Sequence, residues 1–257
     1  MRVGIRMVGV LTLSCGVFLV GGCAGAPPTP SGAGAMIEGG EPATLVVDDM
    51  FPPNERVRRT ASLDPKTHEV LGVETSTREM LDDDSWVVRS SGDDDDEKSA
   101  GEMIFRRQDD GSVALVSLIA ATPKALARGQ ARYHFEPALV MTPARLDVGE
   151  TFEHTSDVRI VSLEDESEVI QTGTALRRLE LVGRQEFGTR GGEVETLRVR
   201  ARFQMTLGAT VVTNDSIVWV EPGGGALAES TRRVVKVFGV PVQEARSLEQ
   251  EAASVGE

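Results

Sequence analysis

Cysteine and histidine, the side chains most often used as nucleophiles and metal ligands, are scarce in this 257-residue sequence, with two cysteines and three histidines. The histidines are His68, His134 and His154, and no two of them lie within four residues of each other. His68 and Glu69 begin a zinc-protease pattern, but Gly72 stands where its second histidine belongs. The sequence also contains no nucleophile elbow, phosphate-binding loop or dinucleotide fingerprint. We therefore expect no catalytic residue, no metal ion and no other cofactor.

The second cysteine, Cys23, ends a segment that reads as a secretory signal. Arg2 and Arg6 precede an uncharged, mostly apolar run of 14 residues, 7–20, which is shorter than the roughly 20 residues a membrane-spanning helix needs. The motif Leu19-Val20-Gly21-Gly22-Cys23 resembles the lipobox of bacterial lipoproteins. The resemblance implies a signal peptide over 1–22 and a lipid-modified Cys23.

Three alternatives to lipidation at Cys23 stay open. An ordinary signal could be cleaved after Cys23-Ala24-Gly25-Ala26, Cys15 could be the modified residue, or the segment could be a retained membrane helix. In the lipoprotein class, Ala24 rather than Asp after the cysteine implies sorting to the outer membrane. We therefore expect a cell-envelope protein, facing the periplasm, whose membrane attachment comes from the lipid at Cys23.

Charge limits the partners of the mature chain. The formal net charge is −13, and loss of the two leader arginines makes it −15. Such a surface is repelled by phosphate backbones, so we expect no nucleic-acid binding. With Cys15 removed and Cys23 acylated, the mature chain has no disulfide and no free thiol. The expected partners are the membrane, an envelope protein or an apolar ligand.

Arg198, Arg200 and Arg202 point to one face of a single predicted strand. Because guanidinium groups match carboxylates and phosphates, this stripe is a candidate anion or partner face. The alternative is that the arginines pair with acids on neighbouring strands, for example Glu180 or Glu168.

One aromatic residue and two acidic runs are further candidates. Trp219 lies in a strand rich in Val and Ile, so it could stack on a ligand or pack in the core. The acidic runs 82–84 and 93–97 are typical of solvated loops. A calcium loop starting at Asp93 would have Lys98 and Ile104 where glycine and glutamate are needed.

The elements that must position these residues are strands. Along 196–207, apolar residues alternate with polar ones, a pattern typical of a half-buried strand in an antiparallel sheet. Residues 23–41 are rich in Gly, Pro and Ala and are expected to form a flexible tether. One antiparallel β domain is expected over 42–248, followed by a disordered tail over 249–257.

The predicted fold is mainly β: a single antiparallel, strongly curved sheet, either a half barrel or an open barrel, with at most one or two short helices. One helix is expected over 123–130, where Ala, Leu and Arg favour it. An outer-membrane barrel is disfavoured because the few aromatic residues do not cluster at strand ends.

Two segments resemble uncharacterised bacterial envelope proteins in which a Trp-bearing strand ends in a Pro-Gly-x-Gly turn. They are Pro137-Ala138-Leu139-Val140-Met141-Thr142-Pro143 with the following Leu146-Asp147-Val148-Gly149-Glu150, and Ile217-Val218-Trp219-Val220-Glu221-Pro222-Gly223-Gly224-Gly225. Those families distantly resemble the half-barrel lipoprotein carriers LolA and LolB, which implies a similar curved sheet.

Three functions follow as hypotheses. The first is a lipid-anchored envelope protein with a non-enzymatic binding or structural role. The second is a carrier or assembly factor for lipids or lipoproteins, which needs an apolar cavity. The third is an enzyme with an unrecognised site, which would gather His134 or His154 with two carboxylates.

Overall fold

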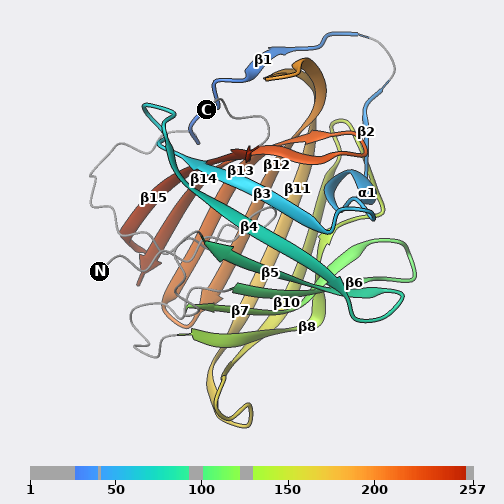
Figure 1. Ribbon diagram of the computed structural model, residues 1–257. Coiled ribbons are helices and arrows are strands. Elements are labelled where there is room, and N and C mark those ends of the chain that lie inside the picture. The colour runs from blue at the N-terminus through green and yellow to red at the C-terminus, as the bar shows by residue number, and fades with distance from the viewer. Residues whose placement is uncertain (1–26, 40–41, 93–100, 122–129, 253–257) are drawn as a thin grey trace.

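A computed structural model describes residues 27–39, 42–92, 101–121 and 130–252 of the chain, most of which lie in strands (Figure 1). The predicted signal peptide, Cys23, the acidic run 93–97 and nearly all of the expected helix over 123–130 lie outside the described residues. No helix within the described ranges is both long enough and apolar enough to cross a membrane.

The first part of the chain holds the only helix of the described residues, which is a single turn. Its elements are β1 (Ala33–Met36), β2 (Thr44–Val46), α1 (Val47–Met50), β3 (Val57–Leu63), β4 (Val70–Met80), β5 (Ser85–Gly92), β6 (Gly101–Arg107), β7 (Val113–Ala121) and β8 (Gln130–Thr142). The second part contains only strands. They are β9 (Arg145–Asp147), β10 (Thr151–Ser162), β11 (Val169–Thr189), β12 (Gly192–Leu207), β13 (Thr210–Glu221), β14 (Gly225–Val237) and β15 (Val240–Glu251).

The strands form a closed antiparallel barrel. Starting at β11, the order around the barrel is β10, β8, β7, β6, β5, β4, β3, β15, β14, β13 and β12, and β12 pairs with β11 again. Strand β1 adds to the outside of this ring at β11, and β2 pairs with β9 in a separate small sheet. In Figure 1, β3 to β5 cross in front of β11 to β14, because these two groups of strands form opposite walls of the barrel.

The prediction of an open sheet or half barrel is therefore wrong, although the antiparallel β class and the scarcity of helix are correct. The sheet closes because β3 pairs with β15, with Leu63 opposite Leu248 and Thr60 opposite Glu251. These partners lie near opposite ends of the chain. Alternation within each strand shows which face is buried but carries no information on which distant strand completes the ring.

The inner face of the barrel holds the main apolar core. Along β8, the side chains of Ala131, Tyr133 and Phe135 are buried, whereas Arg132 and His134 between them are partly exposed. The same alternation along β12 buries an inner row of apolar residues, which are Leu197, Val199, Ala201, Phe203, Met205 and Leu207. Burial of the apolar side chains at alternate positions of each strand is the main force that holds the closed sheet together.

Helix α1 and the turn after it plug one opening of the barrel. Phe51 packs against Trp86 and Phe105, with ring centroids 6.0 and 5.3 Å away. The buried carboxylate of Asp49 fixes the plug, because its two oxygens accept hydrogen bonds from the backbone N–H groups of Val46 (2.9 Å) and Gly223 (2.8 Å).

Two segments that the sequence assigned to the linker and the tail contain ordered strand. Residues 33–36 of the expected tether form β1, and residues 249–251 of the expected tail end β15. Both segments gain order from backbone pairing with the barrel, which composition alone does not reveal.

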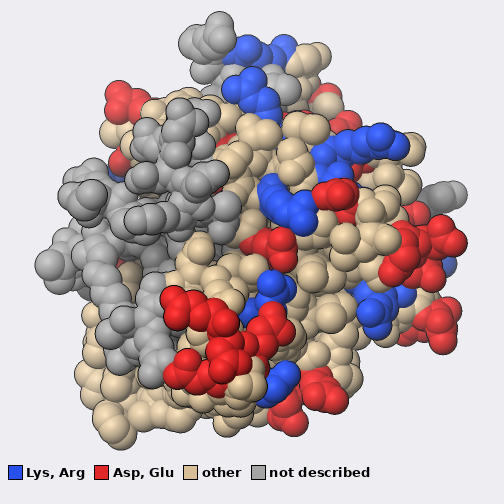
Figure 2. Space-filling model, turned by 60° about the horizontal axis from the view of Figure 1, so that its bottom comes forward, with Lys and Arg blue, Asp and Glu red and all other residues tan. Residues whose placement is uncertain are grey.

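Acidic side chains gather on one part of the outer surface. Figure 2, which brings the lower end of the barrel forward, shows acidic side chains gathered on that face. The turn between β10 and β11 projects at this lower end in Figure 1, and it carries the exposed residues Glu164, Asp165, Glu166 and Glu168.

Removal of the Asp49 carboxylate is expected to loosen the plug. In Asp49→Ala, the N–H groups of Val46 and Gly223 lose a charged acceptor, and each such hydrogen bond contributes about 1.5–3 kcal/mol. We expect the free energy of unfolding, measured in urea, to fall by about 3 kcal/mol. The matched variant is Asp48→Ala, whose carboxylate forms an exposed ion pair with Arg107, so its loss should be below about 1 kcal/mol. Equal losses in the two variants would contradict this role of Asp49.

Candidate functional site

The predicted arginine face does not present three free guanidinium groups. Arg200 pairs with Glu180 at 3.2 Å, and Arg202 pairs with Asp215 at 2.6 Å, both across neighbouring strands. Arg198 lies beneath β1, where its guanidinium donates to the sulfur of Met36 at 3.8 Å. Pairing with neighbouring acids, the alternative reading of the sequence, describes two of the three arginines. Anion binding by this face remains a prediction that would require both ion pairs to open.

Trp219 is buried on the outer face of the barrel. Its indole N–H donates to Oε1 of Gln185 at 2.9 Å, and its ring lies 6.0 Å from that of Phe187. Leu227 and Ala228 complete this outer apolar cluster, against which Ala33 packs. Because only 1% of Trp219 is exposed, a ligand could stack on it only after the N-terminal segment moved away. The ligand-stacking role therefore stays a prediction.

The histidines lie apart and form no metal site with other described residues. Burial lowers the pKa of His134, with further lowering by Arg159 and Arg132 against an opposing effect of Glu166. Burial also lowers the pKa of His154, whose Nδ1 accepts a hydrogen bond from the Val140 N–H at 3.2 Å. Both imidazoles therefore favour the neutral form in the folded protein.

A polar cluster inside the barrel was not predicted. Arg177 is 3% exposed, and its Nε donates to the carbonyl oxygen of Met141 at 3.2 Å. Burial lowers its pKa to about 10, and the carboxylate of Glu229 partly opposes this effect. The hydroxyl of Thr231 donates to Glu229 at 3.0 Å and contacts the Ser216 hydroxyl at 2.7 Å. The sequence signal was Arg177 itself, which occupies an inward position in an alternating strand.

A segment that we call the strap, residues 28–37, crosses the outside of the barrel over β11 and β14. Its carbonyl oxygens at Pro28, Gly32 and Gly34 accept hydrogen bonds from the barrel. The donors are the Ser230 hydroxyl, the Gly188 N–H at 2.7 Å and the Gln185 side-chain amide at 2.8 Å, respectively. At the far end of the strap, the N–H of Ile37 donates to the carbonyl oxygen of Arg184 at 3.0 Å.

Gly32 allows the strap to approach the barrel closely. A Cβ atom at this position would lie 2.5 Å from the carbonyl oxygen of Gly188 and 2.9 Å from the Phe187 ring. Carbon atoms do not approach backbone oxygen that closely, so any other residue would push the strap outward. The glycine therefore fixes the depth of the strap on the surface.

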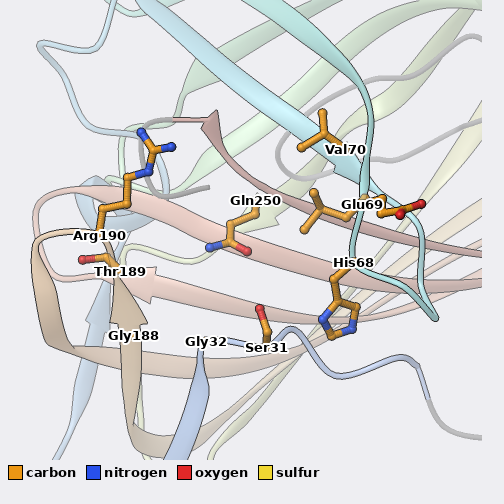
Figure 3. A pocket seen from close by; sticks show the side chains of 10 residues that line it. Ser31, Gly32, His68, Glu69, Val70, Gly188, Thr189, Arg190 and Gln250 are labelled. Carbon is orange, nitrogen blue, oxygen red and sulfur yellow. The ribbon is translucent and has the colours of Figure 1, made fainter. Parts of the chain in front are cut away.

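A pocket of about 530 Å³ opens beside the strap, and we call it the strap pocket (Figure 3). Three separate segments bring its walls together: the strap, the β3–β4 turn and the β11–β12 turn, with one residue of β15 between them. The residues that line it are Ser31, Gly32, Leu63, His68, Glu69, Val70, Gly188, Thr189, Arg190 and Gln250. Its volume lies within the range of about 300–1,000 Å³ that is typical of small-molecule sites.

The β3–β4 turn is held in place by Asp64. Its carboxylate accepts hydrogen bonds from the backbone N–H groups of Thr67 and Lys66, which lower its pKa. The carbonyl oxygen of Asp64 also accepts the N–H of His68 at 2.9 Å. His68 then takes a φ of 60°, a left-handed conformation that costs a non-glycine residue about 1 kcal/mol or more. This strained turn carries the imidazole to the wall of the pocket.

Polar side chains line much of the strap pocket. Within the described chain, the guanidinium of Arg190 has no acidic partner within ion-pair distance, and the His68 imidazole makes no hydrogen bond. The hydroxyl of Ser31 and the amide of Gln250 also border the space. In Figure 3, the Glu69 carboxylate points away from Ser31 and Arg190. This arrangement suits a small polar or anionic group.

Neither His68 nor Arg190 was singled out as a pocket residue by sequence reasoning. Their turns are 122 residues apart in the chain, counted between these two positions, and only the closed barrel brings them to one place. The one local signal was the polar turn Asp64-Pro65-Lys66-Thr67-His68-Glu69, which is typical of a hairpin and carries no ligand information by itself.

Comparisons with known proteins give little beyond this description. No protein-family model matches the chain, and no curated protein matches it. A solved structure of a protein from Parabacteroides distasonis ATCC 8503, described as a "putative lipoprotein", aligns with 80% of this chain and 97% of its own. The sequence identity is 10% and the TM-score is 0.37, a value at which the likeness supports no conclusion about fold or function.

Proposed function

We propose that this protein is a lipid-anchored protein of the cell envelope whose barrel binds a small polar or anionic ligand rather than catalysing a reaction. The observation that carries the binding role is the strap pocket, with its volume of about 530 Å³ and the side chains of Arg190 and His68, which have no hydrogen-bond or ion-pair partner among the described residues. The lipobox-like sequence ending at Cys23 supports the anchor, and Ala24 after it supports the outer membrane, on the periplasmic side.

A role as carrier of lipids or lipoproteins has less support. A carrier needs an apolar cavity, and the mostly apolar pocket beside Phe51, Trp86 and Phe105 has a volume of only about 70 Å³. This is far below the range of about 300–1,000 Å³ that is typical of ligand sites. Side chains of the main core occupy the inner face of the barrel.

An enzymatic role also has less support than binding. Ser31 and His68 both line the strap pocket, but no hydrogen bond joins them in the described structure. A serine nucleophile requires a base within hydrogen-bond reach, and that base requires an orienting group. Glu69, the acid next to His68, points away from Ser31 (Figure 3).

The anchor is tested by expression with a labelled fatty acid in a bacterium that processes lipoproteins. We expect label in the parent protein and none in Cys23→Ala, which also keeps its leader, residues 1–22, because the lipobox is lost. Because Cys23 lies outside the barrel sequence, the variant should keep the parent's far-ultraviolet circular dichroism and unfolding midpoint. Fatty-acid label retained in Cys23→Ala would contradict lipidation at this residue.

The pocket is tested by titration of the protein expressed without residues 1–23, which lacks both the leader and the lipid, with inorganic phosphate and, separately, with acetate. We expect saturable shifts of the His68 imidazole signals in nuclear magnetic resonance spectra. Loss of the guanidinium in Arg190→Gln should weaken binding about tenfold, a change of about 1.4 kcal/mol. Arg178→Gln is the matched control, since it removes an exposed arginine of β11 that does not line the pocket. Unchanged affinity in Arg190→Gln, or no saturable shift at His68, would contradict the proposed site.

A further inference from the structure

The strap shortens the free length of chain between the proposed anchor and the barrel. Composition alone makes residues 24–41 a flexible spacer, whose root-mean-square span would be about 20–25 Å. In the structure, Pro28 is already bonded to Ser230 on β14, and further bonds follow at Gly32, Gly34 and Ile37. Most of the expected spacer is therefore part of the folded barrel.

The remaining length limits how far the barrel can lie from the lipid. Five residue steps separate Cys23 from Pro28, and an extended chain spans at most about 3.6 Å per residue, or about 18 Å in total. A freely moving domain on a spacer that runs to residue 41 could reach about 65 Å by the same measure. The strap therefore reduces the reach of the anchor more than threefold.

We propose that the strap holds the barrel against the membrane in one orientation, in which the end of the barrel that carries the strap faces the lipid surface. This inference rests on the proposed acylation of Cys23. The surface nearest the bilayer is then the one around Pro28 and Ser230. The strap pocket opens beside the membrane, because Ser31 and Gly32 of the strap line it.

The distribution of charge agrees with this orientation. The acidic turn between β10 and β11, residues 164–168, lies at the opposite end of Figure 1 from β1. Figure 2 shows acidic side chains gathered on the face that includes that end. Anionic headgroups repel carboxylates. An orientation in which the end of the barrel that carries the strap contacts the bilayer keeps this turn away from the headgroups.

The orientation is tested with acylated protein on phosphatidylcholine vesicles that contain an energy-acceptor lipid. The mature chain offers no free thiol besides the acylated Cys23, so single dyes can be attached in Glu193→Cys, near the strap, and Asp165→Cys, in the acidic turn. Strand β11, with 21 residues, separates the two positions, and at about 3.3 Å per residue it spans about 65 Å. We expect energy transfer at least about twofold larger from position 193 than from position 165, since transfer falls steeply over such a length.

Release of the strap should remove this difference. Gly32→Ala places a Cβ atom 2.5 Å from the Gly188 carbonyl oxygen, whereas in the control Gly191→Ala the nearest atom is the Thr189 hydroxyl at 3.6 Å. We expect equal transfer from both dyes in Gly32→Ala and the parent's difference in Gly191→Ala. A ten-residue Gly/Ser insertion after Ala24 leaves the barrel sequence intact, so it tests the same point if Gly32→Ala does not fold.

Equal transfer from both positions in the vesicle-bound parent would overturn the orientation while leaving the anchor in place. If the difference in energy transfer between positions 193 and 165 persisted after the insertion, the orientation would also be overturned, because the short segment between Cys23 and Pro28 could not be its cause. A parent protein that carries no acyl group at Cys23 would instead refute the proposed anchor and, with it, this inference.

Discussion

The pairing of β3 with β15 is the interaction on which the rest of the structure depends. It joins four residue pairs, from Leu63 opposite Leu248 to Thr60 opposite Glu251. Without it, β3 and β15 would be two unpaired edges, each exposing a row of backbone donors and acceptors. Closure removes both edges and seals the apolar inner face. It also builds the strap pocket, because Leu63 and Gln250 belong to this ladder and line that pocket.

The strap and the outer face of the barrel also depend on each other. Phe187, Trp219 and Leu227 form an apolar cluster on the outside of the barrel, where they would be in contact with water if the N-terminal segment were absent. The strap covers them and satisfies its own backbone groups through Gly188, Gln185 and Ser230. The energy that orders this segment comes from covering aromatic surface and pairing backbone groups, so its glycine- and proline-rich composition does not make it a free spacer.

The sequence contained much of the local structure. The alternation along 196–207 predicted the inner and outer faces of β12. Of the two acids named as examples of partners for the arginine stripe, Glu180 forms an ion pair with Arg200. Local patterns in the sequence did not predict which distant segments would pair. Closure by β3 and β15, the strap on β11 and the placement of His68 and Arg190 around one pocket each join segments that no local pattern connects. The inward arginine, Arg177, was visible as a break in an apolar row, but its partners Glu229 and Met141 come from distant strands.

The most direct test of the account is whether β3 and β15 are paired in solution. Nuclear Overhauser effects on the protein expressed without residues 1–23 can measure this. We predict cross-strand effects between Ala61 and Gln250 and between Leu63 and Leu248, together with slow hydrogen exchange of the β3 amides. Rapid exchange along β3 with no effect between the two strands would show an open sheet. That result would contradict the closed barrel and the pocket that depends on it.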